Sequence, residues 1–111
     1  MTPAVVGLVA GVGRATVEVH RRPVVGILAT GDELRSPGQD LGPAGIPDSN
    51  GPGMRAMVEA AGGATRVLGV AVDRLDDVRG RLGAGLVEGA DAIIVSGGVS
   101  VGPYDVVRAA F

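Results

Sequence analysis

Apolar residues concentrate in three short runs along the chain, and stretches of mixed polarity separate these runs. The runs cover residues 24–29, 64–72 and 92–95, and the second includes Thr65 and Arg66 near its start. The continuous run at residues 24–29 is typical of a parallel strand that is covered on both faces, and the other two runs predict a second and a third strand. Each run stops at polar residues or glycines, so each predicted strand has a defined carboxyl end.

The segments between these runs show helical spacing. Before the second run, a helix is expected to begin near Asn50 and to end at Gly62-Gly63. Its inner face would be formed by Met54, Met57, Val58 and Ala61. Before the third run, apolar residues recur at intervals of three and four, which predicts an amphipathic helix: Leu75, Val78, Leu82 and Leu86. Asp76 and Asp77 at its start favour the positive end of the helix dipole. A last helix is expected from Pro103 or Tyr104.

The first 22 residues follow a different pattern. Thr2-Pro3 predicts an N-cap and a first helical position, with the helix ending near Gly11 or Gly13. Residues 15–20 alternate between apolar and polar, which predicts a half-exposed strand. We therefore assign residues 1–22 to a lead-in helix and strand of a preceding region, and residues 23–111 to one domain.

Strands and helices that alternate in this way predict an α/β protein in which a mostly parallel sheet has helices on both faces. Ligands of such folds bind at the carboxyl ends of the strands. Three polar segments lie there in the sequence, at residues 30–33, at Asp73 and at residues 96–105. We expect them to form one pocket.

Composition excludes several classes of function. The chain has no cysteine and a single histidine, which argues against disulfides, thiolate metal sites and a Ser-His-Asp triad. A net charge of −2 and only two aromatic residues leave no basic field or stacking platform for nucleic acid. The uncharged stretch 1–13 is too short to span a membrane. A cytoplasmic protein without nucleic-acid or membrane partners is expected.

The segment from Ser96 to Gly102 places three glycines and two serines between a predicted strand and a helix. Successive backbone N–H groups in such a loop, with a helix dipole behind them, can bind an anion such as a phosphate. An ordinary glycine-rich turn is the alternative. The loop is not a Walker A motif, because the chain has no lysine.

Carboxylates flank this loop in the predicted fold. Asp32 and Glu33 follow the first strand, Asp73 follows the second and Asp105 follows the glycine loop. Acids beside a phosphate site can hold Mg²⁺ together with substrate oxygens, or can orient a water molecule. Each acid alone could instead cap a helix or lie in an exposed turn. Residues 48–50, Asp-Ser-Asn, could cap the next helix or reach a polar ligand.

These motifs resemble those of the MoeA-type molybdopterin molybdenumtransferases, a family to which gephyrin is related. The resemblance rests on residues 24–34, which end in Thr-Gly-Asp-Glu-Leu, on Pro37-Gly38, and on Gly-Ile-Pro-Asp-Ser-Asn at residues 45–50. Its most distinctive part is Ser-Gly-Gly-Val-Ser-Val-Gly at residues 96–102, followed by Asp105.

The resemblance implies a three-layer α/β/α domain of the MoaB/MogA-like molybdopterin-binding type, incomplete at its C-terminal end. It implies insertion of molybdate into adenylylated molybdopterin with release of AMP, which requires Mg²⁺. Glu33, Asp73 and Asp105 would be the catalytic acids, with Glu33 and Asp105 as metal ligands. The resemblance also implies a homodimer for the full-length protein. The residues that would hold the pterin and the phosphate are Thr30, Gly31, Asp32, Asp48, Ser49, Asn50, Ser96, Gly97, Gly98, Ser100 and Gly102.

Two other functions fit the same fold. One is a MogA-like molybdopterin adenylyltransferase, and the other is a non-catalytic molybdopterin-binding or scaffold module. The Gly-Val-Ser-Val-Gly sequence together with residues 48–50 favours the MoeA type. A scaffold would tolerate loss of Glu33 and Asp105, yet both acids are present.

Overall fold

The computed structural model describes residues 1–97 and 106–111. Its centre is a parallel sheet of three strands, β1 (Val24–Thr30), β4 (Ala64–Ala71) and β5 (Ala92–Ser96). Their order is β4-β1-β5, so the first strand is the central one. The three apolar runs of the sequence thus form the three strands of this sheet, and the parallel pairing that they predict is confirmed.

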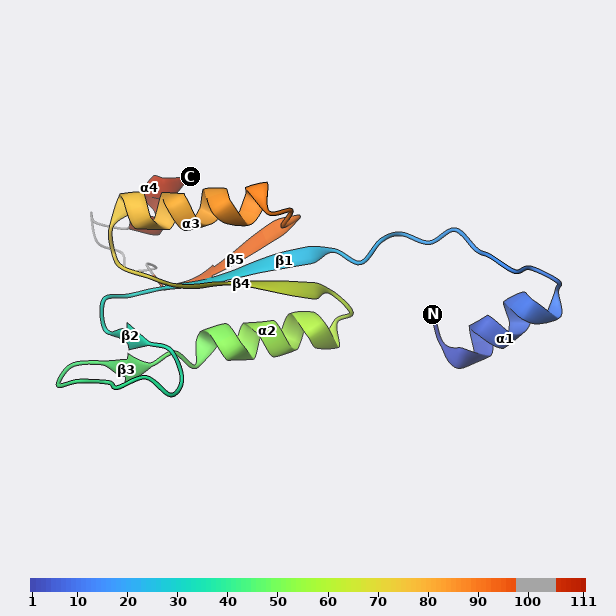
Figure 1. The fold of residues 1–111 in the computed structure, drawn as a ribbon, viewed down its shortest axis with the longest axis horizontal. Coiled ribbons are helices and arrows are strands. Elements are labelled where there is room, and N and C mark those ends of the chain that lie inside the picture. Colours follow the sequence, from blue (N-terminus) through green and yellow to red (C-terminus); the bar gives the residue numbers. More distant parts are fainter. Residues whose placement is uncertain (98–105) are drawn as a thin grey trace.

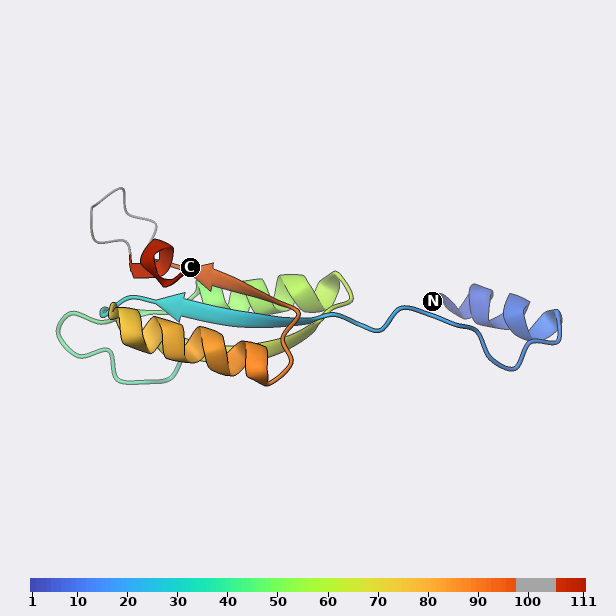
Figure 2. The ribbon, with the colours of Figure 1, turned by 90° about the horizontal axis from the view of Figure 1, so that it is seen from above.

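Helices cover both faces of the sheet. α2 (Asn50–Ala60) lies on one face and α3 (Leu75–Val87) on the other, as Figures 1 and 2 show from two directions. α4 (Val106–Ala110) packs beside α3. This arrangement is the three-layer α/β/α architecture that the alternation of elements predicts. None of the helices in the described part of the chain has the length and hydropathy that a membrane span requires.

The core lies between the sheet and α3. Its buried members are Leu28 of β1, Ala71 of β4, and Val78 and Leu82 of α3. The helical spacing correctly predicts the last two. Leu86, however, is 58% exposed, which contradicts the predicted fourth position of that face.

Gly85 takes the inward position that Leu86 was expected to occupy. A Cβ atom on Gly85 would lie 2.8 Å from Leu68 and 3.3 Å from Ile93, so α3 approaches the sheet closely at this turn. The buried positions of α3 are therefore Val78, Leu82 and Gly85.

The inner face of α2 is also narrower than predicted. Met54 and Val58 are half-buried, while Met57 is 73% exposed. Positions 51, 54 and 58 of α2 form a stripe at intervals of three and four, and Met57 lies outside it. The expectation that Met57 belongs to the core is wrong.

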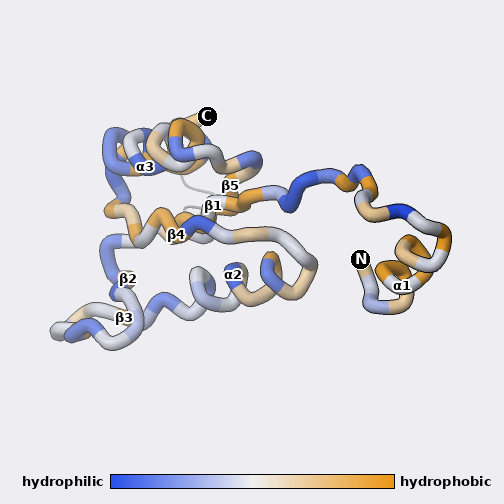
Figure 3. Tube along the Cα trace, turned by 45° about the vertical axis from the view of Figure 1, so that its right-hand side comes forward, coloured by the Kyte–Doolittle hydropathy of each residue, from blue (hydrophilic) through white to orange (hydrophobic). Residues whose placement is uncertain are grey.

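The N-terminal segment lies away from the sheet (Figure 1). α1 (Pro3–Gly11) begins as predicted, with the hydroxyl of Thr2 accepting a hydrogen bond from the Val5 amide at 3.4 Å. No residue of α1 is buried, although Figure 3 colours several of them as hydrophobic. The strand expected at residues 15–20 does not form, because these residues pair with no strand in the described chain and Val19 is 67% exposed.

Asp91 joins this segment to the sheet just before β5. Its carboxylate forms a two-pronged ion pair with Arg21, with a distance of 2.7 Å between Nη1 and Oδ2, and also accepts the amide of Val24 at 2.8 Å. These hydrogen bonds lower the pKa of Asp91 to about 2. The start of β1 is therefore fixed by a side chain from the neighbouring strand.

The segment between β1 and α2 contains a small parallel pair of strands. β2 (Leu34–Arg35) pairs with β3 (Ile46–Pro47). The amide of Ile46 donates to the carbonyl of Glu33 at 2.8 Å, and the amide of Asp48 donates to that of Arg35 at 2.8 Å. The loop is therefore closed at its base and returns the chain to the start of α2.

Candidate functional site

A crevice is expected at the carboxyl ends of β1 and β5. From β1 the chain passes through α2 to β4 on one side, and from β4 it passes through α3 to β5 on the other side. Ligands of open α/β sheets bind where successive connections leave in opposite directions in this way. The last residues of the two strands, Thr30 and Ser96, lie at this point.

Gly97 lies directly against Thr30 there. Its φ angle is +103°, and a Cβ atom would lie 2.2 Å from the carbonyl oxygen of Thr30. Only glycine fits such a close approach between backbones at a positive φ angle. Two residues from the predicted cradle, which are far apart in sequence, are thus in contact.

Ser96 connects the crevice to α2. Its Oγ accepts a hydrogen bond of 2.9 Å from Nδ2 of Asn50, the first residue of that helix. Asp48 is 8% exposed and accepts the amide of Gly51 at 2.9 Å. Of the two interpretations of residues 48–50, the cap is confirmed for Asp48, while contact with a polar ligand stays a prediction; Asn50 lies at the end of β5, bonded to Ser96. Ser49 is exposed and its side chain caps nothing.

Two of the predicted acids lie next to each other at the ends of β1 and β4. The hydroxyl of Thr30 donates to Oδ1 of Asp73 at 3.2 Å, and the amide of Asp73 donates to Oδ1 of Asp32 at 3.0 Å. Thr30, Asp32 and Asp73 are therefore one hydrogen-bonded unit, as expected from their positions at one edge of the sheet.

Glu33 lies beside this unit. A Cβ atom on Gly31 would be 2.9 Å from both carboxylate oxygens of Glu33, so this side chain folds back over the glycine. A substitution at Gly31 would push the carboxylate away from the end of β1. Gly31 itself is held by a hydrogen bond of 3.1 Å from its amide to the carbonyl of Ala71.

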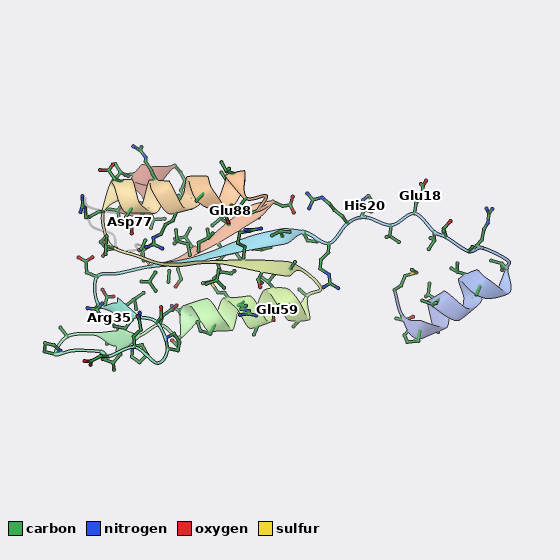
Figure 4. All side chains as sticks on the ribbon, in the orientation of Figure 1. Glu18, His20, Arg35, Glu59, Asp77 and Glu88 are labelled. Atoms are coloured by element: carbon green, nitrogen blue, oxygen red, sulfur yellow. The ribbon has the colours of Figure 1, made fainter. Side chains whose placement is uncertain are left out.

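No group of three acidic or histidine side chains that could enclose a metal ion occurs within residues 1–97 and 106–111. Four of the predicted site residues lie outside the described residues: Gly98, Ser100, Gly102 and Asp105. His20 is exposed on the extended N-terminal segment, at the far end from Arg35 and Asp77 in Figure 4. It contributes nothing to the crevice.

A pocket of about 240 Å³ lies between α2 and the sheet. Ile27, Ala29, Val67 and Val70 form its apolar wall, and Arg55 of α2 lies at its side. Asp48, one of the predicted site residues, also lines this pocket. Sequence analysis did not indicate a pocket on this face of the sheet.

Sequence analysis also missed the way in which α3 holds the end of β4. Asp77 was expected only to favour the dipole of α3. Its Oδ2 in fact accepts the amide of Val72 at 2.9 Å and Nε of Arg81 at 3.2 Å. The hydrogen bond from Val72 and the cation of Arg81 lower the pKa of Asp77. The i,i+4 spacing of aspartate and arginine was a usable signal for this pair.

Comparison with known proteins gives a family match over most of this chain. Residues 26–111 match the family model described as "Probable molybdopterin binding domain". The matched region begins within β1 and includes the rest of that strand, β4, β5 and the residues at their carboxyl ends.

The chain is also similar to curated and solved proteins. It is 43% identical over 111 residues to molybdopterin molybdenumtransferase 2 of Mycobacterium tuberculosis, covering 100% of this chain and 27% of that protein. The molybdopterin molybdenumtransferase of Bacillus subtilis is 39% identical over the same length, with 26% of it covered. A crystal structure of a molybdopterin biosynthesis moea protein from Pyrococcus horikosii superposes with a TM-score of 0.76 at 30% identity, over 93% of this chain and 26% of that one. The chain thus spans about a quarter of the length of the relatives that it matches.

Proposed function

Because this chain belongs to the family of molybdopterin-binding domains, we propose that its crevice binds adenylylated molybdopterin. In a complete protein the domain then contributes to the insertion of molybdate into this substrate with release of AMP. The names of the relatives from Mycobacterium tuberculosis and Bacillus subtilis support this choice of reaction.

The observation that carries the proposal is the contact between Gly97 and Thr30 at the carboxyl ends of β5 and β1. Because Gly97 has no side chain, the ends of β5 and β1 pack closely, with the hydroxyl of Thr30 at the contact. Ser96 and Asn50 supply a hydroxyl and an amide beside it. A phosphate ester that carries a polar ring system fits this set of donors.

The acids would act on the same ligand. We assign Asp73 and Glu33 to the catalytic group because both follow strands at this edge of the sheet. The hydroxyl of Thr30 donates to the Asp73 carboxylate, and the carboxylate of Asp32 accepts the Asp73 amide, so both hold Asp73 in place. Asp105 completes the group in the proposal on the basis of the sequence alone.

Glu33 and Asp105 would hold Mg²⁺. The carboxylate of Glu33 suits this ion chemically, since Mg²⁺ binds through one or two carboxylates with water and substrate phosphate as further ligands. When bound, the ion would neutralise charge on the phosphate that leaves with AMP.

Calorimetric titration tests the proposal. AMP and adenylylated molybdopterin should each bind the protein, and Mg²⁺ should strengthen the binding of both. If neither binds to folded protein, the assignment of the crevice is wrong. Release of AMP from the adenylylated substrate should require molybdate in a complete protein. Formation of adenylylated molybdopterin from ATP and molybdopterin would instead favour an adenylyltransferase of the MogA type.

The organisation of the chain belongs to the same proposal. Residues 1–22 are assigned to a preceding region and residues 23–111 to the molybdopterin-binding domain, which is supported by a family match that begins at residue 26. A cytoplasmic homodimer is proposed for the complete protein by resemblance to the family.

A further inference from the structure

The strand β4 contains an irregularity that decides where Asp73 lies. Along β1 and β4, Ile27 is opposite Val67 but the next residue, Leu28, is opposite Gly69. Leu68 is therefore an extra residue, and the strand bulges. Gly69 follows the bulge with a φ angle of +84°. Bulges of this type alter the direction of a strand and are common next to active sites.

Because of the extra residue, each residue of β1 after Ile27 lies opposite the β4 residue one position later than in a regular ladder. Thr30 is opposite Ala71, and Asp73 comes two residues later. In a regular ladder Thr30 would be opposite Val70, and Asp73 would lie one residue further from it. The bulge therefore places Asp73 one residue nearer to Thr30, whose hydroxyl donates to the Asp73 carboxylate.

Two side chains of α3 hold the bulged segment at its two ends. Nη1 of Arg81 donates to the carbonyl of Leu68 at 2.9 Å, at the extra residue itself. Oδ2 of Asp77 accepts the amide of Val72 at 2.9 Å, directly after the strand. Arg81 and Asp77 are also joined to each other, with 3.2 Å between Nε and Oδ2.

We infer that Arg81 and Asp77 are positioning residues for the crevice: they fix the bulged end of β4 and thereby hold Asp73 beside Thr30. Neither side chain needs to touch the ligand. The consequence for ligand binding rests on the proposed function, whereas the consequence for the backbone does not.

The chain offers a matched control for this pair. Arg66 of β4 and Glu88, the residue directly after α3, form another ion pair, which links the strand to the end of the helix with 2.6 Å between Nη1 and Oε2. This pair lies before the bulge. Glu88→Gln therefore removes a comparable surface ion pair without affecting the end of β4.

Amide hydrogen exchange tests the inference without any ligand. In Arg81→Ala, the Gly31 amide, which donates to Ala71, should exchange about tenfold faster than in the parent protein. Arg81→Lys, which keeps a charged donor for the Leu68 carbonyl, should restore most of the protection. Glu88→Gln should leave the exchange of the Gly31 amide unchanged.

A second experiment measures the affinity of the protein for AMP in the presence of Mg²⁺. Arg81→Ala should weaken its binding by about tenfold, because Asp73 is no longer fixed. If the parent protein does not bind AMP, the proposed function fails while the exchange data still decide the inference. If the Gly31 amide of folded Arg81→Ala exchanges as slowly as in the parent protein, or if Glu88→Gln accelerates its exchange equally, the inference is wrong.

Asp77→Asn provides a second variant in case Arg81→Ala does not fold. Asparagine can still accept the Val72 amide but does not attract Arg81. Faster exchange of the Gly31 amide would support the inference, and unchanged exchange would overturn it.

Discussion

The backbone of Gly97 passes so close to Thr30 that a Cβ atom on the glycine would lie 2.2 Å from the carbonyl oxygen. Real Cβ atoms do not approach a backbone oxygen to this distance, so a side chain at this position has to displace one of the two strands. The contact couples the ends of β1 and β5, and with them the residues on both sides of the crevice.

Gly97→Ala should therefore damage both folding and binding. The positive φ angle alone costs an alanine about 1–2 kcal/mol, and the collision with Thr30 adds to this cost. We expect a lower midpoint of unfolding in urea and a loss of AMP binding of tenfold or more, on the order of 1.4 kcal/mol.

Gly89→Ala is the matched control for backbone strain. Gly89 has a φ angle of +89°, but a Cβ atom there meets no atom within 4 Å. Gly89→Ala should have a lower free energy of unfolding than the parent protein, because alanine is strained at a positive φ angle. It should bind AMP as tightly as the parent protein does. Equal binding losses in the two variants would show that the contact with Thr30 is not what shapes the site.

A double-mutant cycle measures the link between α2 and the crevice. Asn50→Ala and Ser96→Ala each remove one partner of the 2.9 Å hydrogen bond. If the bond holds the end of β5 in place, the two substitutions should be non-additive by about 0.5–1.5 kcal/mol in urea unfolding. Strictly additive effects would mean that the two side chains act independently.

The main elements of this fold were predictable because local patterns determine them. The strands β1 and β5 are largely apolar runs, β4 is apolar from Val67 onward, and α3 presents Val78 and Leu82 at helical spacing. The carboxyl ends of parallel strands share one edge, so topology places Thr30 and Asp73 at that edge. The hydrogen bond between them also involves the bulge in β4, which shifts Asp73 by one position.

Features that depend on neighbours were not predictable in the same way. The alternation at residues 15–20 predicts a strand, but a strand requires a partner and the described chain offers none there. The bulge at Leu68 leaves no sequence signal beyond the glycine that follows it. Likewise, Gly85 rather than Leu86 faces the sheet because helix and sheet approach closely at that turn, which depends on Leu68 and Ile93.

The ion pair of Asp91 with Arg21 should make the free energy of unfolding depend on pH in the acid range. Hydrogen bonds from Arg21 and from the Val24 amide lower the pKa of Asp91 from 3.8 to about 2 in the folded protein. The folded state thus favours the charged carboxylate. The resulting stabilisation should be complete above pH 3.8 and should be lost as the pH falls through about 2.

Urea unfolding of Asp91→Asn and of the parent protein at a series of pH values measures this effect. The parent protein should be the more stable at neutral pH, and the difference should shrink as the pH approaches about 2. Raising the salt concentration should also reduce the difference at neutral pH, because the pair is exposed to solvent. A difference that stays constant across the acid range would contradict the lowered pKa.

In a longer protein that carries this domain, substitution of the acids at the crevice should lower the reaction rate, whereas substitution of an acid at the start of α3 should not. Glu33 lies over Gly31, and Asp73 is held by Thr30, so the proposal assigns both to the space beside the phosphate. Glu33→Gln and Asp73→Asn should each lose about 2–4 kcal/mol of transition-state stabilisation, a rate lower by roughly 30- to 1000-fold. Binding of the adenylylated substrate should fall less, because backbone N–H groups and Ser96 still contact it.

Asp76→Asn is the control for these variants. Asp76 is exposed in the first turn of α3, so its substitution should cost less than about 1 kcal/mol of stability and leave turnover unchanged. Rates of AMP release and of molybdenum insertion, with Mg²⁺ varied, measure the contrast. If Asp76 matters as much as Asp73, or if Glu33→Gln and Asp73→Asn both turn over normally, these acids do not form the catalytic group.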